Sequence, residues 1–376
     1  MKRTVAIVLC FLLMLTGCQK RTADVPQTTT QPQEQSSEPI HAVWVTCYEL
    51  KQMLCQSGET AFQSAFEMAA KRCEQNGINH IFVQVRPFCD AFYCSDLFEW
   101  SSLCRDENGH SPSFDPLKVM VTTAHAHGLK IHAWVNPYRI SYEEGKALPM
   151  SLSAYESYVG CTANGTYFDP SAGAVRELIL NGMREILSGY SVDGIHMDDY
   201  FYPTKDEDFD RKSYAEACAL GNALSLADWR REQVNFLLRG AYSLVKSYGA
   251  DKIFSVSPSA DMQKNRDEDF ADVTVWLKQD GYVDWLIPQA YFGFENEKMP
   301  FEQVIQQWEN LPKAESVRLV CGLAAYKQGK EDEYAGTGHM EWKQNTDVLT
   351  RQRELISSHA KWDGYCLFSY SDSFSE

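Results

Sequence analysis

The residues of this sequence best suited to chemistry are two adjacent carboxylates, Asp198 and Asp199, in the segment DGIHMDDYFYP (193–203). An aromatic run that includes Tyr202 follows them. Cleavage of an acetal needs one protonated and one ionised carboxyl group, and flat aromatic faces pack against sugar rings. The pair could instead cap the next helix or turn, which is a frequent role of Asp after a strand.

This segment is expected to form a β-strand, because Ile195 and Met197 alternate with His196 and Asp198. The apolar residues then share one face of the strand and the polar residues the other. Asp198 therefore points to the same side as His196, and we assign it the ionised role. Asp199 reaches that side only if the strand ends before it, and repulsion between the like charges then raises one of the two pKa values.

The sequence leaves the partner acid open. Asp199 is one candidate, and Glu295 and Asp261, in loops farther along the chain, are the others. The stereochemical outcome, retention or inversion, stays open with it, because it depends on the separation of the two carboxyl groups.

Strands and helices alternate along the domain that must position these groups. Besides the strand that carries Asp198, strands are expected at 41–46, 80–85, 130–135, 252–257, 285–291, 317–323 and 364–369. Helices are expected between them at 60–75, 116–126, 172–188, 227–248, 267–278, 301–309 and 345–359. Such alternation implies an α/β fold with a parallel sheet, and eight units imply a closed (β/α)8 or TIM barrel. Few residues follow Ser369, so we expect the eighth helix to be short or missing.

Polar and aromatic residues gather at the carboxyl ends of these strands, where the functional groups of a barrel lie. Singly, His196 and the tryptophans could be core residues, and Arg86 could neutralise Asp90 or Asp198. Their convergence at one end favours a binding site. The candidates for substrate binding are Trp44, Arg86, Trp134, Asn136, Tyr138, Arg139, His196, Tyr202, Gln289 and Tyr291.

The blocks VWVT, VQVRP, AFYCSDLFEWS, HAWVNPYR, YFDPS, DGIHMDDYFYP, SVSP and IPQAY occur in an order that resembles glycosyl-hydrolase-like family 10. The resemblance covers about residues 41–371, and DDYFYP and HAWVNPYR are its most specific parts. It implies a barrel hydrolase from a bacterial group that includes lipoproteins cleaving peptidoglycan glycan strands stripped of their peptides. By distant similarity to the α-amylase clan, it also implies that the fourth-strand Asp198 is the nucleophile.

The chain departs from the family pattern in two loops. Ser257-Pro258-Ser259-Ala260-Asp261-Met262-Gln263 stands where the family has Ser-Pro-Phe-Gly-Ile-Trp-Arg, so the subsite lined by that loop should differ. Cys89 replaces an expected Gly, which puts the shape of that turn in doubt.

A site for peptide-free strands needs a cation, because muramic acid then exposes a free carboxylate. A guanidinium can bind a carboxylate through two parallel hydrogen bonds. Arg86 and Arg139, on neighbouring strands, are the candidates.

Residues 1–18 are typical of a lipoprotein signal peptide. Lys2 and Arg3 precede a short apolar run, and Leu15-Thr16-Gly17-Cys18 resembles a bacterial lipobox, which implies lipidation of Cys18. The polar residues 19–40 are expected to form a flexible tether, followed by the barrel domain at 41–376. We therefore expect a protein anchored to the cell membrane by lipid, on its extracytoplasmic face. The alternative is a secreted protein in which Cys18 is incidental.

The net charge of −16, with no offsetting Lys/Arg cluster, argues against a nucleic-acid partner. The cysteines include no CxxC pair, so no structural zinc is expected. Neither a metal nor a cofactor is implied, and we expect a monomer. Export permits disulfides, and Cys89, Cys94 and Cys104 are the cysteines best placed to pair, although several could be buried thiols.

Two further functions remain compatible with the sequence. One is hydrolysis of another polysaccharide, such as an α-glucan or a capsule glycan. The other is a glycan-binding lipoprotein without catalysis, which would have little need for an inward carboxylate at Asp198.

Overall fold

The computed structural model describes residues 38–54, 58–199 and 201–374. The expectations for the signal peptide, for Cys18 and for most of the tether lie outside the described residues. Within the described part, no helix is long and apolar enough to cross a membrane.

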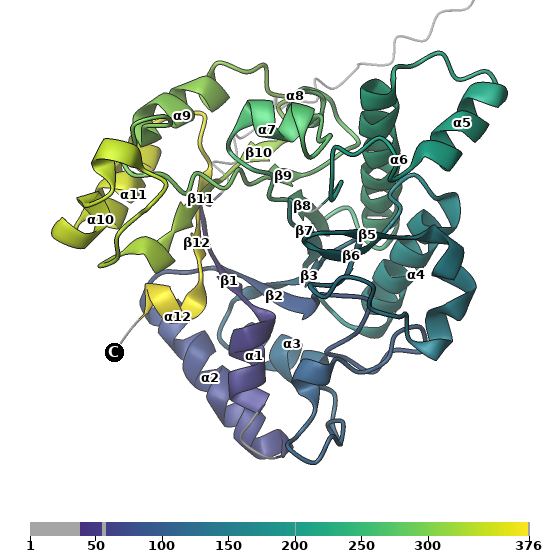
Figure 1. Cartoon of the computed structure of the whole chain (residues 1–376). Coiled ribbons are helices and arrows are strands. Elements are labelled where there is room, and N and C mark those ends of the chain that lie inside the picture. Colours follow the sequence, from purple (N-terminus) through teal and green to yellow (C-terminus); the bar gives the residue numbers. More distant parts are fainter. Residues whose placement is uncertain (1–37, 55–57, 200, 375–376) are drawn as a thin grey trace, which may run out of the picture. The chain divides into compact units, whose positions relative to one another are not determined.

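The predicted (β/α)8 barrel is confirmed, with the strands in the centre and helices around them (Figure 1). The strands are β1 (Ile40–Val45), β2 (His80–Arg86), β3 (Lys130–Val135), β7 (Gly194–Met197), β8 (Ile253–Val256), β9 (Trp285–Leu286), β10 (Arg318–Leu319), β11 (Cys321–Ala324) and β12 (Gly364–Phe368). Their order is β10-β9-β8-β7-β3-β2-β1-β12-β11. β10 and β11 are two halves of the predicted seventh strand. β10 pairs with β9 and β11 with β12, and this closes the ring.

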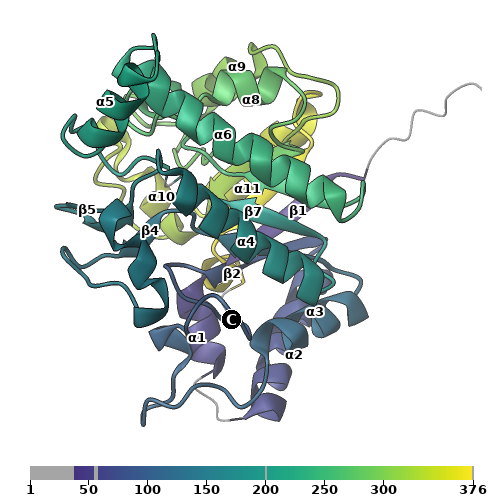
Figure 2. The ribbon, with the colours of Figure 1, turned by 90° about the vertical axis from the view of Figure 1, so that its right-hand side faces the viewer.

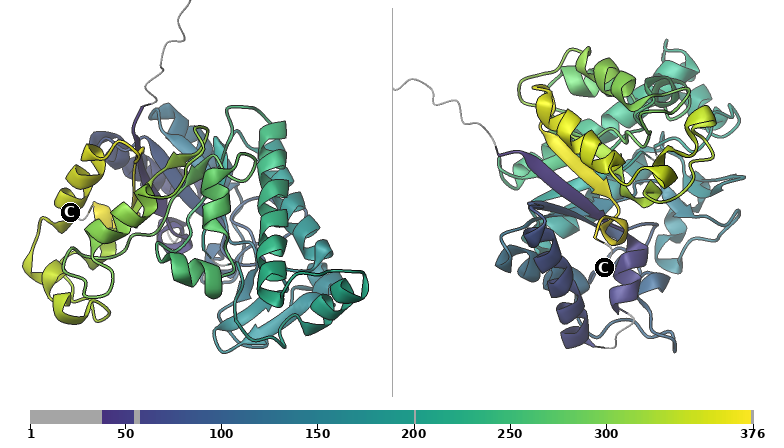
Figure 3. Two further views of the ribbon diagram at one scale, coloured as in Figure 1. Left: turned by 90° about the horizontal axis from the view of Figure 1, so that it is seen from above. Right: turned by 90° about the vertical axis from the view of Figure 1, so that its left-hand side faces the viewer.

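The first and last strands are parallel neighbours, with Ile40 opposite Gly364 and Trp44 opposite Phe368. In Figure 3 the yellow β12 lies beside the purple β1. After β12 the chain forms α12 (Tyr370–Ser373), so the eighth helix is short, as predicted.

The main helices lie where the sequence predicts them, within three residues at each end. In α4, the buried residues Val175, Ile179, Met183 and Ile186 recur every three or four positions, so that one face packs on the barrel. Figure 2 shows α4 beside α6 on the outside of the barrel. The matching helices are α2 (Glu59–Gln75), α3 (Pro116–Ala126), α4 (Gly173–Gly189), α6 (Leu226–Ser247), α9 (Phe301–Glu309) and α11 (Val348–Ser358).

The prediction of one helix over 267–278 is wrong for its first half, before Val273. The chain forms α7 (Met262–Asp267) and then α8 (Val273–Lys278). Between them Phe270 has φ of 51°, a left-handed conformation that a helix cannot contain. α7 begins early because Asp261 caps it, accepting from the backbone N–H groups of Gln263 and Lys264.

An inserted antiparallel sheet between β3 and α4 is not predicted by the sequence. Its strands, in the order β4-β6-β5, are β4 (Arg139–Ser141), β5 (Val159–Thr162) and β6 (Gly165–Phe168). Gly165 has φ of 133°, and a Cβ there would lie 2.1 Å from the Ser141 carbonyl oxygen. Glycine is therefore required where the two strands approach.

Several short helices were also not predicted. They are α1 (Cys47–Leu54), α5 (Arg211–Ala219), α10 (Glu341–Gln344) and the 3-10 helices η1 (Ser102–Cys104), η2 (Met150–Tyr158), η3 (Ala325–Lys327) and η4 (Gly336–Gly338).

Rings fill the barrel interior. Phe82 lies between His132 and His196, with ring centroids 4.8 and 4.4 Å apart, and His80 Nδ1 lies 3.0 Å from His132 Nε2. Burial lowers the pKa of His196 to about 3 and that of His80 to about 4. These histidines are therefore neutral core residues at physiological pH.

The pairing expected for Cys89, Cys94 and Cys104 is wrong, since all nine described cysteines are free thiols. Cys89 and Cys104 are buried among apolar residues, whereas Cys94 is exposed. Burial raises the pKa of the Cys89 thiol to about 12.

Candidate active site

A pocket of about 230 Å³ lies at the carboxyl ends of the strands and contains both carboxylates of the central segment. β7 ends at Met197, so the strand alternation stops before Asp198 and both Asp198 and Asp199 can face the pocket. Of the predicted binding residues, those that line it are Trp44, Trp134, Arg139, Gln289 and Tyr291.

Asp198 is held by two N–H donors on the neighbouring strand region. Trp134 Nε1 donates to Asp198 Oδ2 at 3.2 Å, and Asn136 Nδ2 donates to the same oxygen. Asp198 is only 3% exposed, so these donors replace the water that its carboxylate has lost. Hydrogen bonds to the charged form favour that form, which suits Asp198 to act ionised.

The Asn136 amide is itself oriented by a short relay. Cys47 N–H donates to Gln84 Oε1 at 2.9 Å, and Gln84 Nε2 donates to Asn136 Oδ1 at 2.7 Å. Because the Asn136 oxygen is occupied, its NH2 group must face Asp198. Asn136 is fully buried and positions the carboxylate from below, so it is not the substrate contact that the sequence suggested.

The charged form of Asp199 is disfavoured by burial. Burial raises the pKa of its carboxyl above the ordinary value, although Lys264, the Gln289 side chain and Arg139 act against that rise. A raised pKa lets the group hold a proton at a working pH, as a general acid must. The pocket thus brings together one carboxyl suited to be ionised and one suited to be protonated.

His196 lies beneath the pocket rather than in it. Trp44 Nε1 donates to His196 Nε2 at 2.9 Å, and because that nitrogen accepts, Nδ1 carries the proton and donates to Ser255 Oγ at 2.8 Å. The predicted substrate contact is therefore corrected. Neutral His196 fixes the indole of Trp44, which does line the pocket.

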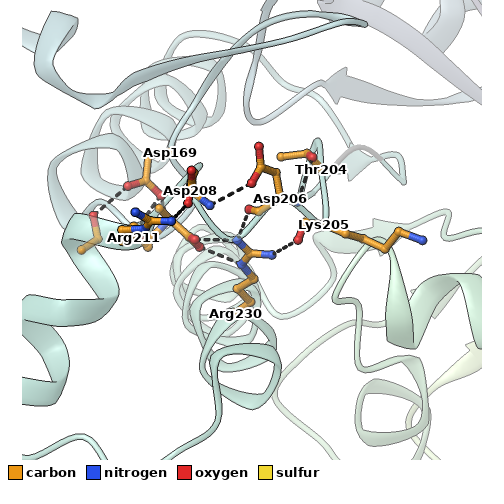
Figure 4. Close-up of polar contacts among 10 residues, drawn as sticks. Asp169, Thr204, Lys205, Asp206, Asp208, Arg211 and Arg230 are labelled. Atoms are coloured by element: carbon orange, nitrogen blue, oxygen red, sulfur yellow. Dashed lines mark hydrogen bonds and ion pairs between the residues drawn. The ribbon is translucent and has the colours of Figure 1, made fainter.

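A buried ion pair holds the segment that follows the carboxylates (Figure 4). Arg230, on α6, donates to both carboxylate oxygens of Asp210 at 2.9 and 2.6 Å. Its guanidinium also donates to the carbonyls of Lys205 and Asp206 at 3.2 and 2.6 Å. The loop after β7 is thereby tied to the rigid outer helix.

The sequence is similar to a family of known proteins. Residues 39–335 match the family described as Glycosyl hydrolase-like 10. The chain belongs to this family. It is 30% identical over 304 residues to Glycosyl hydrolase YngK of Bacillus subtilis (strain 168), a match covering 75% of this chain and 59% of YngK. It is 28% identical over 419 residues to Glycosyl hydrolase DigH of Escherichia coli (strain K12), covering 97% of this chain and 92% of DigH.

Two solved structures share the barrel. Alpha-L-fucosidase isoenzyme 2 from Paenibacillus thiaminolyticus has a TM-score of 0.57 at 12% identity, covering 90% of this chain and 47% of that one. Alpha-amylase from Geobacillus thermoleovorans, complexed with acarbose, has a TM-score of 0.52 at 10% identity, covering 88% and 70%. At these identities the likeness shows the fold alone.

In this member of Glycosyl hydrolase-like 10, the two candidate arginines lie in different places. Arg139 lines the pocket, with its guanidinium 4.5 Å from the Tyr142 ring centroid. Arg86 lies outside it, 2% exposed, stacked 4.7 Å from Phe98 against α4. The register of β2 shifts between Gln84 and Arg86, and such a bulge turns the next side chain to the other face. The prediction of Arg86 at the mouth is therefore wrong.

Three other predicted residues are not in the pocket. Glu295 is exposed in the loop after β9, where its backbone N–H donates to Glu341 at 2.9 Å, so the structure does not bring it to Asp198. Tyr138 is fully buried in the core, so it cannot contact a substrate. Tyr202 lines an adjacent hollow instead. Asp261, the remaining acid candidate, is occupied as the cap of α7.

Sequence reasoning missed Tyr142, Tyr326 and Lys264. Tyr142 and Tyr326 line the pocket, and Lys264 lines the hollow beside it. Tyr326 follows a strand end and could have been found by the rule used for the other strands. Lys264 lies on α7, directly after the segment from Ser257 to Gln263 that departs from the family pattern, and that departure indicated a changed subsite. Among the described residues, no cluster of His, Cys, Asp or Glu is arranged to hold a metal ion.

Proposed function

We propose that this protein is a glycoside hydrolase acting on a cell-wall polysaccharide, namely peptidoglycan glycan strands without their peptides. The observation that carries the proposal is the pair Asp198 and Asp199 in one pocket, in environments that favour opposite protonation states. Membership of Glycosyl hydrolase-like 10 and relatives named as glycosyl hydrolases support it.

In the proposed reaction, Asp199 donates its proton to the glycosidic oxygen as the bond to the leaving sugar breaks. Ionised Asp198 either attacks the anomeric carbon or activates a water that does so. Trp134 and Asn136 keep Asp198 in place and charged. Trp44 and Tyr291 offer aromatic faces to the sugar ring, and burial at the bottom of the pocket excludes bulk water.

The proposed substrate carries a free carboxylate on muramic acid, and Arg139 is the arginine placed to receive it. Arg139 is 4% exposed, and its guanidinium stacks between Tyr142 and Phe88, with distances of 4.5 and 5.7 Å to the ring centroids. Such stacking orients the planar group, and a guanidinium can bind a carboxylate through two parallel hydrogen bonds.

We propose in addition that the protein is anchored to the outer face of the cell membrane through lipid on Cys18. The support is the Leu15-Thr16-Gly17-Cys18 sequence behind an apolar run. The polar residues 19–40 would then separate the anchor from the barrel.

The deciding experiment is incubation of the purified protein with peptide-free glycan strands, with products read by mass spectrometry. Shortened strands are expected from the parent and none from Asp198→Asn. Parallel incubations with an α-glucan and with chitin oligomers test the other polysaccharides. Binding of the strands without any cleavage would instead establish a glycan-binding protein and overturn the hydrolase proposal.

A further inference from the structure

Three hollows adjoin at the mouth of the barrel. The pocket shares Tyr48, Phe88 and Tyr142 with a hollow of about 470 Å³ that Trp100 also lines, here called the outer hollow. It shares Arg139, Tyr142 and Asp199 with a hollow of about 350 Å³, here called the lysine hollow because Lys264 lines it. The pocket is therefore the middle of the three, and Tyr142 borders all of them.

The two carboxyls are not distributed equally among these hollows. Asp198 lines the pocket, whereas Asp199 lines both the pocket and the lysine hollow. An ionised carboxylate in this chemistry must act at the anomeric carbon, inside the sugar that is transferred. A general acid must instead reach the oxygen that joins that sugar to the leaving sugar, at the border between two subsites.

We infer that the glycan runs through the three hollows with fixed polarity, the transferred sugar in the pocket and a carboxylate-bearing leaving sugar in the lysine hollow. The sugars on the non-reducing side then occupy the outer hollow. This inference rests on the proposed function and adds the direction of the chain and the bond that is cut.

The charges of the lysine hollow favour an acidic leaving sugar. Its lining contains the cations Arg139 and Lys264 and the acids Asp199 and Asp269. Lys264 Nζ lies 2.5 Å from Asp269 Oδ2, and burial raises the pKa of Asp269 to about 6. When Asp199 holds the proton that it must donate, cations exceed anions there and a substrate carboxylate is attracted.

Aromatic rings line the outer hollow. The outer hollow has the rings of Tyr48, Phe88, Trp100 and Tyr142, of which Tyr48 is 50% and Tyr142 55% exposed. Exposed rings beside a carbohydrate pocket suit the faces of successive sugars. Hollows on both sides of the scissile bond allow a chain to be cut internally.

The bond that is cut can be read directly from the new chain ends. Peptide-free strands of alternating N-acetylglucosamine and N-acetylmuramic acid are first reduced with borohydride, so that their existing ends stay unlabelled. They are then digested, reduced with borodeuteride and sequenced by tandem mass spectrometry. Deuterium is expected on N-acetylglucosamine, since the acidic sugar leaves. Deuterium on N-acetylmuramic acid, or release of single sugars from chain ends, overturns the inference.

The role of Lys264 is tested at pH 7 with two variants that are expected to change KM in opposite directions. Lys264→Met should raise KM for peptide-free strands by about two- to fivefold, while Asp269→Asn should lower it. Neither should change KM for neutral chitin oligomers. If the pair of Lys264 and Asp269 is only structural, both variants should have a lower Tm and the same change in KM for both substrates. That result overturns the assignment of Lys264 to the substrate carboxylate. Lys212→Met, at an exposed position on α5, is the matched control.

A binding measurement keeps this test independent of the proposed function. The Kd for peptide-free strands is measured by calorimetry for Asp198→Asn, in which no turnover is expected, and for the same variant with Lys264→Met added. If the parent does not cleave the strands, the hydrolase proposal fails, and a weaker Kd on addition of Lys264→Met still supports the carboxylate site. An unchanged Kd overturns it.

Discussion

Asn136 donates a side-chain hydrogen bond to Asp198 from the adjacent strand region, and its own oxygen is held by Gln84 at 2.7 Å. Replacing Gln84 with Leu removes the donor to Asn136 and leaves a buried oxygen unpaired, which costs about 1–3 kcal/mol. We expect kcat to fall by about 5- to 150-fold with little change in KM. Steady-state kinetics check this. Gln84→Glu keeps the size and the acceptor for the Cys47 N–H but also lacks the donor to Asn136, so it should lose kcat as well. An unchanged kcat in either variant would contradict a positioning role.

Asp198 and Asp199 should respond differently to loss of charge. Asp198→Asn keeps the shape and the Trp134 contact geometry but removes the anion, so turnover should fall by several powers of ten. Asp199→Asn should cost about 10²–10⁴-fold on glycan strands. An aryl glycoside with a good leaving group needs less proton donation and should be spared in Asp199→Asn alone. If Asp199→Asn is the variant that stops both substrates, the two roles are reversed.

Asp90 predicts a measurable pH dependence of stability. Burial raises its pKa from 3.8 to about 6. The folded state therefore binds the proton more tightly than the unfolded state, so this group's contribution to stability declines as pH rises from about 4 to 6. Asp90→Asn should unfold at a higher urea concentration than the parent at pH 7.5 and at nearly the same concentration at pH 4. If Asp90→Asn instead unfolds at a lower urea concentration than the parent at pH 7.5, the charged form of Asp90 stabilises the protein.

The buried pair of Arg230 and Asp210 should be sensitive to removal of one partner. Arg230→Met leaves the carboxylate of Asp210 charged and buried, which costs about 3–5 kcal/mol of unfolding free energy. The double variant Arg230→Met with Asp210→Asn should recover part of that loss, because no charge is left behind. Denaturant unfolding of the two single variants and the double variant checks the coupling. Additive losses would contradict it.

The proposed anchor has its own test. Cys18→Ala should leave the protein unprocessed or release it from membranes. Fractionation of cells and intact mass measurement check this, with Cys10→Ala as the control inside the same apolar run. A Cys18→Ala protein that stays with membranes and carries the parent's lipid mass would disprove lipidation at that residue.

The sequence predicts the barrel well because its main signal is local. Apolar periodicity marks α4 and the parallel strands, and alternating units leave one closed arrangement. The antiparallel insert was missed because β4 is three residues long and pairs with β6 far along the chain. Pairing at that distance leaves no periodic pattern in so short a strand.

For the site, the sequence predicts which segments meet but not which way each side chain turns. Asp199 faces the pocket because β7 ends early, and Arg86 turns away because β2 contains a register shift. Both are decided by neighbouring strands rather than by the residues themselves. The relay through Gln84 and Asn136 is likewise invisible until three separate segments are brought together.

The direction in which β1 runs has a practical consequence for handling the protein. Ile40 begins this strand at the amino end of the barrel, whereas the pocket lies at the carboxyl ends. A resin, tag or fused domain joined ahead of Ile40 therefore attaches to the face opposite the pocket and leaves it open to long polymers. A fusion after α12 starts from the carboxyl end of β12, on the same side as the pocket, and would crowd the entry of an insoluble substrate.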